Sequence, residues 1–225
     1  MDTETLYKLK YPIGEFEKPA EITTAILNEW IKTISDFSRV LSKKVEKLTD
    51  SHLDTPYRLG GWTVRQVVHH CADSHMNAFC RFKLTLTEDS PTIKPYFEAL
   101  WAELADSREI PVDDSLFILR GLHARWVVLL QSLSTQDLSR IYIHPEHGRE
   151  FRLDEAIGNY AWHSNHHLAH IKNVVTRIRN YRETKLLHAN VVSQVLQAFS
   201  AALLFAHSTI IHNSSACSFD IDFAA

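Results

Sequence analysis

The chain has 225 residues, 45% of them hydrophobic, and its 24 basic against 27 acidic residues leave a net charge of −3. This composition can build one sizeable core, but it offers no excess positive charge for binding nucleic acid or an anionic membrane. Three irregularly spaced cysteines do not form a disulfide framework, and residues 1–19 lack the apolar segment of a secretory signal, so we expect a cytoplasmic protein that binds neither nucleic acid nor a membrane.

Four long helices are predicted in chain order, after an extended start over residues 1–20 that contains Pro12, Gly14 and Pro19. Apolar residues recur at three- and four-residue intervals over residues 21–48, and again over residues 63–86, where Thr63 is the expected N-cap. The same periodicity predicts helices over residues 113–132 and 153–181. Four such helices joined by these connectors are typical of an all-α antiparallel four-helix bundle.

Two segments are less regular than the helices. Residues 140–152 fit either a short β-hairpin or an ordered loop, because two runs of strand-forming residues flank Glu146-His147-Gly148. Residues 182–225 are expected to be a C-terminal extension, either helical or poorly ordered, and polar residues within its apolar run disfavour a membrane span. The predicted organisation is therefore a bundle over residues 1–181 and an extension over residues 182–225.

The fourth predicted helix carries a cluster of histidines that suits a metal. On a helix, His163, His167 and His170 fall within about 60° of one another, so imidazoles at i and i+4 can converge on one point. His163 and His167 lie nearest the apolar face that meets the core, whereas His166 and His170 turn toward the rim. Two histidines on one helix hold an ion weakly, so a third ligand from another element is expected.

The second predicted helix offers the third ligand in the pair His69-His70. His70 lies closer to the apolar face and is the better candidate, although neighbouring histidines can exchange roles and His69 stays an alternative. Asn77 and Arg81 follow His70 along the same strip of the helix, as one amide and one fixed cation. They are the candidate substrate-binding groups, while no acidic residue lies firmly on this strip as a general base; Asp73 and Glu155 are the nearest guesses.

Several longer segments resemble one known family. They are residues 11–16 (YPIGEF), 53–58 (LDTPYR), 60–77 (GGWTVRQVVHHCADSHMN), 84–89 (LTLTED) and 160–171 (YAWHSNHHLAHI). In this order and spacing, over roughly residues 7–180, the chain resembles the YfiT-type metal-dependent hydrolases of the DinB-like superfamily. The resemblance implies a four-helix bundle, commonly a homodimer, with one zinc or nickel ion. Carried over to this sequence, the family's three ligands are His70, His163 and His167; zinc is the metal we expect.

Three neutral histidines leave a coordination position open, and this predicts chemistry on a small-molecule substrate. The leading hypothesis is a hydrolase in which the ion activates water against an amide or ester. An alternative is a thiol S-transferase, since relatives in the superfamily resemble transferases that use low-molecular-weight thiols such as bacillithiol. A third hypothesis, a metal-stabilised interaction bundle that is not an enzyme, predicts a fourth protein ligand and no cleft.

Overall fold

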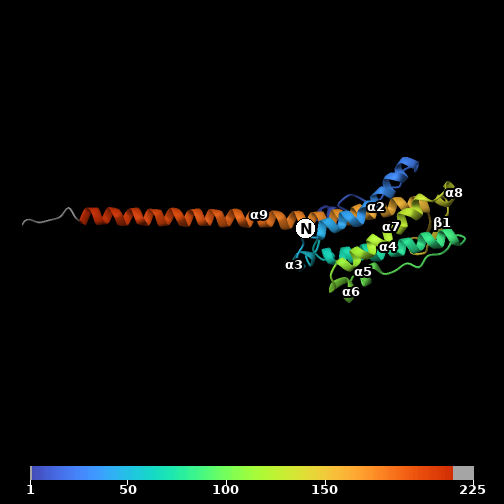
Figure 1. Ribbon diagram of the computed structural model, residues 1–225, viewed down its shortest axis with the longest axis horizontal. Helices are drawn as coiled ribbons and strands as arrows, with labels where there is room; N and C mark the ends of the chain where they lie inside the picture. Colours follow the sequence, from blue (N-terminus) through green and yellow to red (C-terminus); the bar gives the residue numbers. More distant parts are fainter. Residues whose placement is uncertain (1, 215–225) are drawn as a thin grey trace, which may run out of the picture. The chain divides into compact units, whose positions relative to one another are not determined.

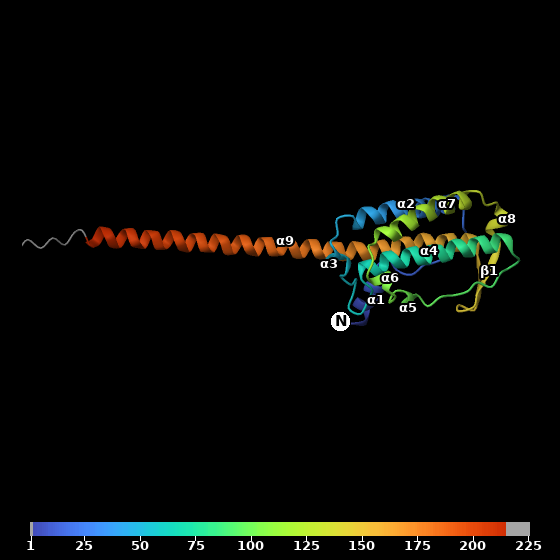
Figure 2. The same cartoon turned by 60° about the horizontal axis from the view of Figure 1, so that its bottom comes forward.

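A computed structural model describes residues 2–214 of the chain, with side chains for residues 2–197. The chain divides into two compact units between Thr176 and Arg177. In the first unit, four long helices lie side by side in two views (Figures 1 and 2). They are α2 (Thr24–Val45), α4 (Val64–Thr87), α7 (Asp113–Gln131) and the part of α9 (Leu153–Ser214) that precedes Arg177. The predicted helical bundle is confirmed.

Short helices connect or precede the long ones: α1 (Thr3–Lys10), α3 (Asp50–Leu53), α5 (Glu98–Trp101), α6 (Ala105–Arg108) and α8 (Thr135–Leu138). The first of these corrects the expectation of an extended start. Asp2 caps α1 by accepting a hydrogen bond from the backbone N–H of Thr5 at 2.8 Å, and Glu4 pairs with Lys8 one turn later. The helix is compatible with Pro12 and Gly14 because both residues follow its end.

Helices α2 and α4 begin where threonine side chains cap them. Thr23 Oγ1 accepts from the backbone N–H of Ile26 at the start of α2. At α4, Thr63 Oγ1 accepts from the N–H of Gln66 at 3.1 Å, and the Gln66 side chain accepts from the N–H of Thr63 at 2.9 Å. This reciprocal pair is a capping box, so the predicted N-cap at Thr63 is confirmed.

The core of the first unit lies between these helices. The inward face of α2 carries buried apolar residues three or four positions apart, and α9 meets it with Leu153, Ile157 and Ala161. Trp126 of α7 is fully buried and packs its ring edge-on against Phe82 of α4 at a centroid distance of 5.4 Å. Trp126 also packs edge-on against Tyr160 of α9 at a centroid distance of 5.5 Å, so one ring contacts both α4 and α9, the two helices that carry the histidines of interest.

Of the two alternatives for residues 140–152, the structure has the hairpin. Strands β1 (Ile141–His144) and β2 (Arg149–Arg152) pair antiparallel, and the turn between them places Gly148 at φ +62°, in the left-handed region that glycine adopts readily. The preceding connector joins the hairpin edge, because the N–H of Ile93 donates to the carbonyl of Ile143 at 3.0 Å. The hairpin and the connector therefore lie together beside α4 and α9.

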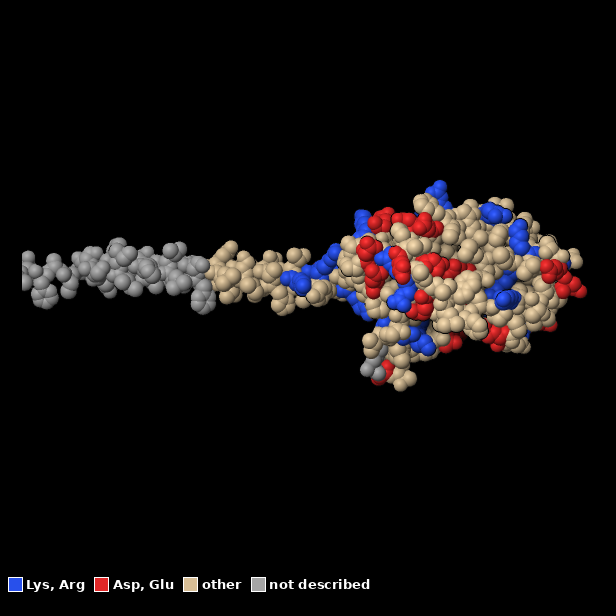
Figure 3. Space-filling model, turned by 90° about the horizontal axis from the view of Figure 1, so that it is seen from below, with Lys and Arg blue, Asp and Glu red and all other residues tan. Residues whose placement is uncertain are grey.

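The second unit begins at Arg177 and is helical as far as Ser214, the end of α9, so the fourth helix continues beyond the predicted end at residue 181. Residues 215–225 of the predicted extension lie outside the described residues. No helix in the described range is long and apolar enough to cross a membrane. On the face drawn in Figure 3, acidic and basic side chains are interspersed, in agreement with the near-neutral net charge.

Candidate metal centre

Three histidines from two helices meet between α4 and α9. His70 comes from α4, His163 and His167 come from successive turns of α9, and one ligand nitrogen from each lies within 4.8 Å of the others. The Nε2 atoms of His70 and His163 are 3.2 Å apart, and the ring centroids of His163 and His167 are 4.5 Å apart. The structure thus brings together the three residues that the sequence selected as ligands.

The spacing of these nitrogens suits a tetrahedral ion. With zinc–imidazole bonds of 2.0–2.1 Å, two ligands of a tetrahedral site are separated by about 3.3 Å, which is close to the observed Nε2–Nε2 distance. Three imidazoles and no carboxylate form a donor set that matches a borderline divalent metal such as zinc or nickel. The residues present therefore fit such an ion.

All three imidazoles are held in the neutral form that ligation requires. Burial lowers the pKa of His70 to about 3, with a smaller contribution from His166. Burial also lowers the pKa of His163 and His167 well below the usual value, and the neighbouring histidines add to the effect. At neutral pH the three side chains carry lone pairs rather than charges, so no proton has to leave before a cation binds.

A chain of buried histidines stands behind His163. Its Nδ1 lies 3.2 Å from Nε2 of His75, whose Nδ1 lies 2.7 Å from Nε2 of His123 on α7. With Nε2 of His163 as the ligand atom, Nδ1 carries the hydrogen and donates to His75, which in turn donates to His123. No pattern in the sequence pairs His75 with a ligand, so this partnership is a finding of the structure.

His167 has a similar support. Its Nδ1 is 3.5 Å from Nδ1 of His170, and Nε2 of His170 donates to the carbonyls of Leu9 and Lys10, each at 3.1 Å. His166, His167 and His170 also form a second group with ligand atoms within 4.8 Å. Because the backbone already occupies Nε2 of His170, we assign that residue to orienting His167. Both His166 and His170 are buried, whereas the sequence placed them toward the rim.

The choice between His69 and His70 is decided by their directions. Nδ1 of His69 lies 2.8 Å from Oγ of Ser115 on α7, and its Nε2 faces the carbonyl of Ile110 at 3.4 Å. His69 is therefore held on the far side of α4 from α9. The structure brings His70 to the cluster, as the helix-face argument favoured.

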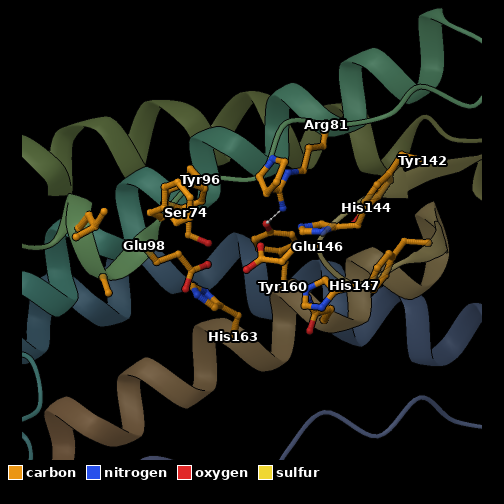
Figure 4. Close-up of a pocket in the computed structure, with 16 residues that line it drawn as sticks. Ser74, Arg81, Tyr96, Glu98, Tyr142, His144, Glu146, His147, Tyr160 and His163 are labelled. Carbon is orange, nitrogen blue, oxygen red and sulfur yellow. Dashed lines mark hydrogen bonds between the residues drawn. The ribbon is translucent and has the colours of Figure 1, made fainter.

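A cavity of about 430 Å³ opens onto His163 (Figure 4). Helix α4 contributes Ser74 and Arg81 to its wall, the connector contributes Tyr96 and Glu98, and the hairpin contributes residues including His144. Its volume is in the range of small-molecule sites. Of the two predicted substrate-binding residues, Arg81 lines this cavity. Asn77 does not; its amide donates to the carbonyl of Asp73 one turn earlier.

Two acidic residues, Glu98 and Glu146, line the cavity, and no pattern in the sequence pointed to either. Glu98 begins the short helix α5 and lines the same cavity as His163, and both are labelled in Figure 4. Burial raises the pKa of Glu98 above its usual value, the nearby Arg81 opposes the shift, and Glu146 adds to it. Of the acids guessed from the sequence, Glu155 is engaged by Arg149 at 2.8 Å, and Asp73 does not line the cavity.

The family model described as the DinB superfamily matches residues 34–171, which include all of α4 and the histidines of α9 from His163 to His170. The chain belongs to the DinB superfamily. Several relatives within the superfamily are similar over almost their whole length. Proteins from Bacillus cereus strain 03BB102 and Bacillus thuringiensis subsp. konkukian, both named "Putative metal-dependent hydrolase", are 55% identical over 170 residues, covering 76% of this chain and 97% of theirs.

A solved structure is also similar to this chain. It is YfiT from Bacillus subtilis, described as a probable metal-dependent hydrolase with an unusual four-helix bundle topology. The identity is 48% with a TM-score of 0.74, and the match covers 76% of this chain and 98% of YfiT. The resemblance expected from the sequence segments is confirmed, and the relatives' names imply that a metal is needed, in agreement with the histidine cluster.

Proposed function

We propose that this chain is a hydrolase that acts on an amide or ester with one divalent metal ion, held by His70, His163 and His167. The observation that carries the proposal is the cavity that His163 lines, because one member of the three-histidine cluster thereby borders a space large enough for a small molecule. The names of the relatives that span the whole bundle support the same reaction class.

The protein groups around the cavity have complementary roles in such a reaction. A divalent ion at the three imidazoles would supply Lewis acidity and lower the pKa of water toward 7. We assign Glu98 as the proton acceptor, because it lines the same cavity as His163 and its pKa is raised. The oxygen of water adds to the carbonyl carbon, the carbon–nitrogen or carbon–oxygen bond breaks, and Glu98 returns the proton to the leaving group.

We propose zinc as the metal, since the separation of the His70 and His163 nitrogens suits a tetrahedral ion. We also propose a small-molecule substrate, for which the cavity has room, and a homodimeric state, as the resemblance implied. The non-enzymatic alternative requires a fourth protein ligand and no cleft. In the described part of the chain, the cluster has three members and a cavity beside it, so the hydrolase is the better interpretation.

The experiment is metal analysis of the purified protein followed by turnover assays with and without a chelator. We expect about one zinc per chain, hydrolysis within a panel of amides and esters, and loss of turnover when the metal is removed. A parallel panel pairs electrophiles with low-molecular-weight thiols. Thiol conjugation without hydrolysis would replace this proposal by the transferase, and chelator-insensitive turnover would remove the metal from the reaction.

A matched pair of variants tests the ligand assignment. His163→Ala should remove most of the bound metal and leave the helical circular-dichroism spectrum in place, because the helix keeps its other packing contacts. His188→Ala is the control, since His188 is exposed and bonds to the backbone of Thr184. Full metal retention by His163→Ala would contradict the assignment.

A further inference from the structure

The cavity beside His163 contains an arginine, Arg81, that has no carboxylate of a described residue in direct contact, although Glu98 is near enough for the guanidinium to lower its pKa. Arg81 is partly buried, its Nε has no hydrogen-bond partner, and it forms no ion pair with any residue whose side chain is described. Its one polar side-chain contact is a long hydrogen bond of 3.5 Å from Nη1 to the hydroxyl of Tyr160. A guanidinium that is partly withdrawn from water normally has an acceptor in direct contact with its Nε and Nη atoms, so the unpartnered Nε of Arg81 points to a ligand.

Two further groups lie beside this guanidinium. Figure 4 shows the side chains of Arg81, Tyr160 and His144 directed toward one another from α4, α9 and β1. His144 is 6% exposed, and its Nδ1 has no hydrogen-bond partner. Burial raises the pKa of Tyr160 and lowers that of His144 to about 4, so at neutral pH the phenol keeps its hydrogen and the imidazole is neutral. These three groups can all donate to one acceptor.

The other charges of the cavity limit what this acceptor is. Glu98 and Glu146 also line the wall and are accessible to solvent. One guanidinium can neutralise one negative charge. A phosphate dianion carries two, would be repelled by both glutamates, and would have only Arg81 to neutralise it among the residues lining this cavity. A planar carboxylate also matches the two-pronged donor geometry of arginine. The chemistry of the wall therefore favours a monocarboxylate.

We propose that Arg81, Tyr160 and His144 bind a free carboxylate of the substrate, so that the substrate class is a small amide or ester bearing a carboxylate away from the bond that is cleaved. The identity of that bond rests on the proposed hydrolysis, while the carboxylate site does not. In this arrangement the carboxylate lies at the Arg81 end of the cavity and the reacting carbonyl lies at the His163 end.

Two probes of nearly equal size test the site. N-acetylglycine carries an amide and a free carboxylate, and N-acetylglycinamide replaces that carboxylate by a neutral amide. Binding is measured on the full chain, zinc-loaded and after chelation, by calorimetry and by the ¹⁵N–¹H signal of Arg81 Nε. We expect N-acetylglycine to bind at least about ten-fold more tightly in both forms and to shift the Nε signal. Equal affinity for the two probes, or no binding of N-acetylglycine, would overturn the proposal.

Arginine variants assign the discrimination to Arg81. Arg81→Gln should abolish the preference for N-acetylglycine, and Arg81→Lys, which keeps the charge but loses the fork, should retain only part of it. Arg125→Gln is the matched control, because Arg125 of α7 lies over the ring of Phe79, does not line the cavity, and its loss removes the same charge. Retention of the full preference in Arg81→Gln, with the wild-type circular-dichroism spectrum, would refute the site.

The assays also separate this proposal from the hydrolase proposal. If the preference for N-acetylglycine is present but neither amides nor esters are hydrolysed, the hydrolysis fails and the carboxylate site stands. If the zinc-loaded protein hydrolyses charged and neutral substrates with equal kcat/KM, the hydrolysis stands and the carboxylate site fails.

Discussion

At the scale of single residues, the metal cluster depends on which nitrogen of each histidine carries a hydrogen. His75 holds Nδ1 of His163 at 3.2 Å and thereby selects the form whose Nε2 faces His70. An imidazole without such a partner divides its population between two forms, only one of which is ready for the ion. The hydrogen-bonded neighbour is therefore as much a part of the site as the ligand.

We expect His75→Leu to weaken zinc binding by about ten- to a hundred-fold, because Nδ1 of His163 loses its acceptor. His75→Gln should restore part of the affinity, since an amide oxygen can accept the same hydrogen bond. Zinc affinity is measured by competition with a chromophoric chelator, and circular dichroism checks that both variants fold. Wild-type affinity in His75→Leu would show that His75 only fills space.

Residue-level prediction from the sequence succeeded where the information was local. The i,i+4 spacing of His163 and His167 fixes their common direction on any helix, and the apolar face of α4 favoured His70 over His69. Glu98 could not be found in this way. It lies on a four-residue helix with no periodic pattern, and long-range contacts of the connector with β1 and with Gln66 of α4 bring it to the cavity.

At the scale of elements, α9 packs closely on α2 through a glycine. A Cβ built on Gly158 would lie 2.7 Å from two ring atoms of Trp30, so the absence of a side chain lets the ring rest on the helix backbone. Gly121 of α7, by contrast, has nothing within 4 Å of such a Cβ. The two glycines thus have opposite roles within their helices.

This contrast gives a paired prediction on stability. Gly121→Ala should raise the free energy of unfolding by up to about 1 kcal/mol, because alanine favours the helix and meets no neighbour. Gly158→Ala gains the same propensity but must displace Trp30, so we expect a net loss of about 1 kcal/mol. Urea unfolding followed by circular dichroism measures both, and equal effects of the two substitutions would show that Trp30 moves aside at no cost.

The elements themselves were predictable to different degrees. The long helices follow from caps and apolar spacing, as at Thr63, where a side-chain oxygen, Gln66 and the buried face all mark the same start. Helix α1 was missed, since residues 3–10 have no buried face and are stabilised by a cap and one ion pair. Whether the helix continues past residue 181 was left open, because two features of the sequence oppose each other. No residue there stops a helix, but no clear apolar face shows where such a helix would pack.

At the scale of the whole molecule, many buried neutral histidines make stability depend on pH. The pKa is lowered to about 3 for His70 and to about 4 for His123 and His166, in each case mainly by burial. In the unfolded chain these groups take up protons near pH 6.5, while the folded chain does not. The unfolded state therefore binds more protons below this pH, and folding stability must fall as the pH falls.

For the metal-free protein we expect full stability above about pH 7 and a progressive loss from about pH 6.5 down toward pH 4, at up to about 1.4 kcal/mol per pH unit for each such histidine. Urea unfolding in the presence of a chelator measures this profile. Added zinc should raise the stability by a similar amount across this range, because the folded ligands carry no proton that the ion has to displace. A flat profile between about pH 7 and pH 5 would contradict the buried neutral state.

Through the hydrogen bonds from His170 to the carbonyls of Leu9 and Lys10, residues near the start of the chain help to orient a site formed by helices much later in the sequence. One practical consequence concerns how the protein is produced. A version cloned from a later start codon, or one whose leading turn is unwound by a fused purification tag, would lose these two acceptors and leave His167 less firmly oriented. Such preparations would report a weaker zinc site than the intact chain has.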